Sequence, residues 1–132
     1  MRKHTFKTFI ALLAFIFIGS FANAQAFDKI ANAIKAGDAG ALAAHFQGNV
    51  EITIKSGGNS YSKSQAEMVL KNFFSGHQPK AFTIAHQGTS PEGSKYLIGN
   101  LSTSSGNYRA YVYAKTVNNV LVVQEIRFEE QQ

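Results

Sequence analysis

Residues 108–128 read YRAYVYAKTVNNVLVVQEIRF, and this stretch decides the fold. Side chains of two kinds alternate on both sides of Asn118-Asn119, which is typical of strands with one buried face. An Asn-Asn pair tolerates the positive φ angles that a two-residue hairpin turn requires. The pattern therefore predicts two antiparallel neighbouring strands, over residues 108–116 and 120–128.

Further strands and helices are predicted upstream of this hairpin. Residues 81–87 and 95–102 have strand patterns, and their short connections favour an antiparallel meander. Apolar residues at helical spacing predict helices over 26–35, 39–46 and 64–74, and alternation predicts earlier strands over 50–55 and 60–62. This order, ααββαββββ, predicts an α+β fold in which three helices pack in the concave face of a strongly twisted antiparallel sheet.

The turns predict which residues share a face of the last three strands. With the Asn-Asn pair as one turn, Tyr113 opposes Gln124. With Ser105-Gly106 as the other turn, Tyr111 opposes Asn100. The first face carries bulky side chains, namely Tyr96, Ile98, Asn100, Arg109, Tyr111, Tyr113, Val122, Gln124, Ile126 and Phe128. The second is mostly small and aliphatic, with Leu97, Gly99, Leu101, Ala110, Val112, Ala114, Leu121, Val123, Glu125 and Arg127.

Large side chains suit a concave face that must fill the space beneath helices. We therefore expect the bulky face to line the inside of the cone and to hold a small, partly apolar ligand. The expected ligand-binding residues are Tyr111, Tyr113, Asn100 and Gln124, with Arg109 near the rim. Core tyrosines whose hydroxyls reach a partner, and an arginine paired with Glu129 or Glu130, are the alternative interpretations.

The aliphatic face would then lie outside. If no helix covers this face, it is a large apolar patch that favours a symmetric homodimer. The residues of this predicted dimer face are Leu97, Leu101, Val112, Leu121 and Val123.

The sequence contains no recognisable catalytic or metal-binding motif. Nucleophile elbows, phosphate loops, dinucleotide fingerprints and His-Glu-x-x-His are absent from it. His45, His77 and His86 lack metal-ligand spacing. Glu51 and Glu125 are expected to point away from the interior, where an acid–base enzyme needs a carboxylate. We expect no catalytic residue, metal or cofactor, and keep an isomerase- or dehydratase-like enzyme as a second alternative to the binding module.

The first 24 residues are typical of a cleaved signal peptide. Arg2, Lys3 and Lys7 precede an apolar run over 9–18, which is too short to cross a bilayer, and Ala22-Asn23-Ala24 is a small-x-small cleavage signal. We expect residues 25–132 to form one exported domain, in the periplasm or outside the cell. Without cysteine the chain forms no disulfide and lacks the residue that a lipid anchor requires.

Charge argues against nucleic acid as a partner. Three of the 13 Lys and Arg residues lie in the signal peptide, which leaves ten basic residues against eight acidic ones. A net charge of +2, scattered along residues 25–132, does not form the basic stripe that binds phosphate backbones.

Several segments resemble a known family. Residues 96–99 (YLIG), 108–113 (YRAYVY) and 124–128 (QEIRF) are similar to an uncharacterised secreted family of Bacteroidota, domain of unknown function 4783. Phe73-Phe74, His77 and residues 79–82 (PKAF) are similar to the same family's passage from helix to sheet. The resemblance implies export and a nuclear-transport-factor-2-like (NTF2-like) cone, the fold of ketosteroid isomerase and scytalone dehydratase. It implies no activity.

Overall fold

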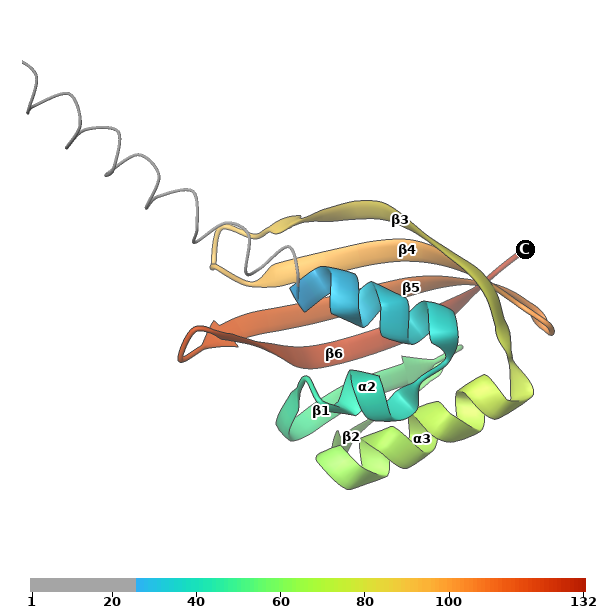
Figure 1. The fold of residues 1–132 in the computed structure, drawn as a ribbon, viewed down its shortest axis with the longest axis horizontal. Coiled ribbons are helices and arrows are strands. Elements are labelled where there is room, and N and C mark those ends of the chain that lie inside the picture. Colours follow the sequence, from blue (N-terminus) through green and yellow to red (C-terminus); the bar gives the residue numbers. More distant parts are fainter. Residues whose placement is uncertain (1–25) are drawn as a thin grey trace, which may run out of the picture.

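The structure, a computed structural model, describes residues 26–132 (Figure 1). The predicted signal peptide and its cleavage site after Ala24 lie outside the described residues. A helix over residues 26–36 comes first, followed by α2 (Ala39–Ala43), β1 (Phe46–Ile54), β2 (Gly57–Ser62), α3 (Lys63–Gly76), β3 (Pro79–Thr89), β4 (Lys95–Thr103), β5 (Gly106–Val117) and β6 (Val120–Gln131). The predicted α+β order is confirmed.

The helix boundaries follow local chemistry. The helix over residues 26–36 ends at Gly37, whose φ of 66° suits glycine. The side chain of Asp38 then caps α2 by accepting a hydrogen bond from the backbone N–H of Ala41 at 3.0 Å. Ser62 and Gln65 form a reciprocal capping box at the start of α3.

The six strands form one sheet in the order β2-β1-β6-β5-β4-β3. β1 pairs with β6 in parallel, and the other neighbours are antiparallel. Figure 1 shows the sheet as strongly twisted, with the helix over residues 26–36 across its middle strands and α2 and α3 beside β1 and β2. The helices therefore cover one face of the sheet and leave the other face without a helix among the described residues.

The hairpin turns differ in how well they were predicted. Asn118 and Asn119 have φ angles of 50° and 63°, and Val117 pairs with Val120, so this turn is confirmed. The preceding turn is wrong by one residue, because Thr103 pairs with Gly106 around Ser104-Ser105. The resulting shift of the register is even, so the predicted sharing of faces between β4 and β5 holds.

A β-bulge changes the register between β5 and β6. Ala114 pairs with Val123, but Tyr113 pairs with Glu125, and Gln124 is left unpaired between them. Beyond the bulge, Ile126 pairs with Val112 and lies on the aliphatic face. The predicted grouping of Ile126 and Phe128 with the tyrosines is therefore wrong.

The concave face of the sheet is the aliphatic one, so the predicted orientation of the two faces is also wrong. The residues of the expected dimer face, Leu97, Leu101, Val112, Leu121 and Val123, are at most 5% exposed and belong to the core beneath the helices. Burial of these side chains removes the exposed apolar patch on which that dimer face depended.

The reason for this orientation is that the helices supply the bulk of the core. Phe27, Ile30 and Ile34 reach the core from the helix over residues 26–36, and Phe73 and Phe74 reach it from α3. Close packing then requires small side chains on the sheet below them, and Ala110 and Ala114 meet this requirement. The bulky side chains of Tyr96, Tyr111 and Tyr113 consequently face outward, whereas Tyr108 near the start of β5 is buried.

Candidate functional site

The outer face of the sheet holds three neighbouring rows of side chains, and the register places them. Tyr96 pairs with Tyr113, which pairs with Glu125. In the next row, Ile98 pairs with Tyr111, which pairs with Arg127. In the third, Asn100 pairs with Arg109, which pairs with Glu129. We call these nine residues the tyrosine face: Tyr96, Tyr113, Glu125, Ile98, Tyr111, Arg127, Asn100, Arg109 and Glu129.

Ion pairs order the charged part of the tyrosine face. Arg127 Nη2 lies 3.1 Å from Glu125 Oε1, and Arg127 Nη1 lies 3.5 Å from Glu129 Oε1. The hydrogen bond with Glu125 and the charge of that carboxylate raise the pKa of Arg127. The Arg127 side chain is nevertheless 40% exposed. The pairs therefore hold the guanidinium in position while part of it stays accessible from outside.

The three tyrosines are half-buried and need no helix to cover them. Tyr96 lies over Gly88 of β3, where a side chain on residue 88 would collide with the ring. Tyr111 and Tyr113 are flanked by Ile98 and by the paired charges of β6. Such a surface offers apolar rings and hydroxyls together, which suits a partner that brings both kinds of contact.

The predicted ligand-binding residues are brought together, but outside the cone. Asn100, Tyr111 and Tyr113 lie on the tyrosine face, so their predicted place on the inside is wrong, and Arg109, predicted near the rim, lies on the same outer face. Gln124 is the exposed extra residue of the bulge. These residues face outward because the helices cover the opposite face of the sheet. That they bind a ligand stays a prediction.

The interior is packed with aromatic rings at the end of the sheet near His77. Phe73 stacks on Phe128 with ring centroids 4.6 Å apart, and its ring stacks on His77 at the same distance. Tyr108 meets the rings of Phe73 and His77 edge-on at 5.3 and 5.4 Å. These rings fill the interior at this end of the sheet.

Tyr108 is a buried residue to which the sequence analysis assigned no role. It is 1% exposed, its hydroxyl lies 3.5 Å from Glu130 Oε1, and Glu130 pairs with Lys55 at 3.3 Å. Burial raises the pKa of Tyr108, so the phenol stays neutral at physiological pH. Its alternation with Ala110 and Val112 was the signal that could have placed it in the core.

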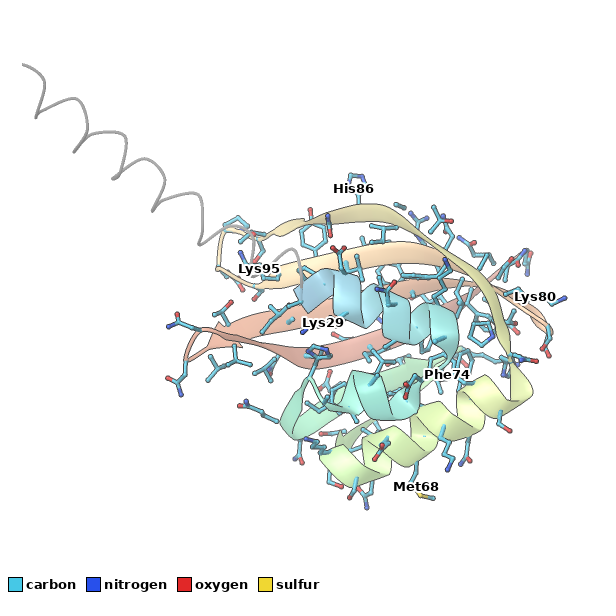
Figure 2. All side chains as sticks on the ribbon, viewed as in Figure 1. Lys29, Met68, Phe74, Lys80, His86 and Lys95 are labelled. Carbon is cyan, nitrogen blue, oxygen red and sulfur yellow. The ribbon has the colours of Figure 1, made fainter. Side chains whose placement is uncertain are left out.

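The histidines occupy three different environments. His77 Nδ1 lies 3.0 Å from the carbonyl oxygen of Phe73, one turn back in α3. Figure 2 shows His86 pointing outward from β3. Burial, and to a smaller extent the charge of Lys29, lower the pKa of His45. Residues 26–132 contain no group of three or more His, Asp or Glu residues that could hold a metal ion.

Residues 26–132 form at least four surface depressions, and Tyr111 and Tyr113 line none of these four. The largest has a volume of about 650 Å³ and lies between β2 and α3. The others border the ends of the helices or the gap between the first described helix and β3. These four concave sites therefore lie away from the tyrosine face.

Comparison with known proteins identifies the family. The profile of the family described as domain of unknown function (DUF4783) matches residues 27–129. The chain belongs to the DUF4783 family. A DUF4783 protein from Bacteroides uniformis is 30% identical, with a TM-score of 0.75 over 80% of this chain and 96% of that one. One from Bacteroides ovatus is 25% identical, with a TM-score of 0.75 over 79% and 94%.

More distant structures give the fold of this DUF4783 protein. An NTF2-like protein of unknown function from Shewanella oneidensis is 12% identical and has a TM-score of 0.62 over 84% of this chain and 98% of that one. The NTF2-like fold expected from the resemblance is thus confirmed. None of the curated proteins matches the chain. No helix within residues 26–132 is long and apolar enough to span a membrane.

Proposed function

We propose that this DUF4783 protein is an exported, noncatalytic binding module of the cell envelope that binds a partner protein through the tyrosine face. The observation that carries the proposal is the row-by-row register that places three half-buried tyrosines beside Ile98, Arg109 and Arg127. Tyrosine and arginine are the residue types that dominate binding energy at protein interfaces.

Shape favours a protein over a small molecule as the partner. Small-molecule sites are concave and enclose most of their ligand. The four depressions described above lack Tyr111 and Tyr113, and aromatic rings occupy the interior. An open face of aromatic and paired charged side chains matches the surface of another folded protein instead.

Export is the second part of the proposal, and it rests on the charged, apolar and small-residue segments of the first 24 residues. We expect the protein recovered from the cell envelope to begin at Gln25. N-terminal sequencing of that protein tests this directly, and an intact Met1 would contradict it.

Photocrosslinking tests the partner. A benzoylphenylalanine at position 111 should give an adduct of defined mass in intact cells, whereas the same group at exposed position 71 of α3 should not. Arg109→Glu should abolish the adduct at 111, because it reverses a charge in the adjoining row. An adduct of twice the chain's mass would make the partner a second copy. Equal labelling from both positions, or none from position 111, would contradict the proposal.

A further inference from the structure

The two edges of the sheet are protected to very different degrees. β3, at one edge, begins with Pro79, carries exposed Lys80 and has a bulge between Ile84 and His86. Proline, lysine and bulges are the devices that prevent another strand from pairing with an edge. β3 is therefore an edge strand that is protected against pairing with another strand.

β2, at the opposite edge, has none of these devices. Its sequence is GGNSYS, its first four residues are exposed, and it pairs with β1 in unbroken register from Gly57 to Ser62. Among the described residues, β1 is its sole strand partner. Every second residue of such an edge directs its backbone N–H and C=O away from the sheet, where they can pair with another strand.

A groove runs beside this unprotected edge strand. Its volume is about 650 Å³, and its lining comes from β2 and α3, namely Asn59, Ser60, Tyr61, Ser64, Gln65, Met68 and Val69. Met68 is 62% exposed, more than any other large hydrophobic side chain of residues 26–132. In Figure 2 it projects outward from α3. None of the seven lining residues carries a charge, so the groove suits an uncharged, partly apolar occupant.

We propose that β2 and this groove bind an extended peptide segment of another protein by strand addition. The free backbone of β2 supplies the hydrogen bonds, and the groove receives alternate apolar side chains of the added strand. Asn59 and Tyr61 lie on the helix side of β2, because their partners Ile52 and Val50 are buried. A strand added beside them projects every second side chain over Met68 and Val69.

A second copy of the chain fits this groove poorly. In an antiparallel pairing of two β2 strands, the helix-side residues that each copy offers are Gly57, Asn59 and Tyr61. Asn59 would then bring an amide over Met68 and Val69, the apolar part of an α3 wall that also contains Ser64 and Gln65. The occupant we infer is therefore a heterologous strand with apolar residues at alternate positions.

Binding of fluorescein-labelled heptapeptides TVTXTVT, with X as Val, Leu, Ile or Phe, tests the proposal by fluorescence anisotropy of the purified protein. We expect at least one of these peptides to bind and the peptide with X as Asp to bind at least about tenfold more weakly. Met68→Lys should weaken binding by a similar factor. Asn72→Lys, an exposed position one turn further along α3, is the matched control and should leave binding unchanged.

Hydrogen exchange locates the peptide, since strand addition should slow exchange of β2 amides and leave those of β3 unchanged. Tyr111→Arg should leave peptide binding unchanged, which separates this proposal from the one on the tyrosine face. Failure of all four apolar peptides, tight binding of the Asp peptide, or protection at β3 instead would overturn the inference. Sedimentation showing a dimer that Met68→Lys dissociates would also overturn it, because the groove would then hold a second copy.

Discussion

Over residues 96–101 of β4 and 109–114 of β5, the two faces of the sheet carry side chains of different size and polarity, and the smaller ones are inside. Leu97, Val112 and Ala114 are fully buried under the helices, whereas Tyr111 and Tyr113 stay half-exposed on the tyrosine face. The comparison teaches that the side chains of the helices and of the sheet must together fill the space between them, and that this decides which face of the sheet lies beneath the helices. A sheet that receives phenylalanines from its helices must supply small residues in return.

Truncation of one aromatic residue on each face tests this comparison most strongly. Phe128→Ala should lower the free energy of unfolding by about 3–5 kcal/mol, because it opens a cavity between Phe73 and Phe74. Tyr111→Ala should cost much less, because its ring lies on the outer face and is already partly exposed. Urea denaturation of both variants measures the difference. Equal losses would mean that the outer face is as tightly packed as the core.

Gly99 marks a close contact within the sheet, between β4 and the neighbouring strand β3. A β-carbon at this position would collide with the ring of Phe82 and would lie 2.9 Å from the carbonyl oxygen of Thr83. Gly99→Ala should therefore destabilise the protein by about 1–3 kcal/mol in urea denaturation. Gly57→Ala, in the open edge strand β2, is the matched control and should change stability by no more than about 0.5 kcal/mol. A neutral Gly99→Ala would show that Phe82 moves aside freely.

The parts of this comparison that follow from local chemistry could be predicted from the sequence. The Asn118-Asn119 turn was identified because both residues tolerate positive φ. Tyr111 and Asn100 were placed on one face because side chains alternate with a strict period of two. These properties need only a few neighbouring residues, so no knowledge of the tertiary structure was required.

The parts that depend on distant residues could not be predicted. The direction of the tyrosines depends on where three helices dock, and no periodicity within β5 encodes that. The bulge at Gln124 also lacks a local marker such as glycine, although it moves Phe128 from the tyrosine face into the core. The extra residue in β6 thus made the predicted face wrong for the residues of β6 that follow it.

A substitution at the N-terminal cap of α3 tests how much this helix contributes to covering the inner face, without changing a core residue of the sheet. The Ser62 side chain accepts a hydrogen bond from the backbone N–H of Gln65 at 3.3 Å, and Gln65 Oε1 accepts one from the backbone N–H of Ser62 at 3.3 Å. Ser62→Ala should cost about 1 kcal/mol of stability, since the backbone N–H of Gln65 loses its acceptor at the start of the helix. Ser75→Ala, exposed in the last turn of α3, should have almost no effect in the same thermal or urea titration. If both variants are neutral, the start of α3 contributes little to covering the core.

The smallest effect is expected on the outer face, where the interactions are electrostatic. Arg127→Gln removes the ion pairs with Glu125 and Glu129, whose side chains are 23% and 44% exposed. Exposed pairs of this kind contribute about 0.2–1 kcal/mol, so the loss should stay within that range at low salt. Raising the ionic strength to about 0.5 M should shrink it, because screening weakens the pairs that the variant lacks. The loss caused by Phe128→Ala should persist at high salt, since it has no Coulombic part. If instead the cost of Arg127→Gln persisted undiminished in salt, Arg127 would act by packing its stem against the tyrosines, and the division of the sheet into an apolar and an electrostatic face would fail.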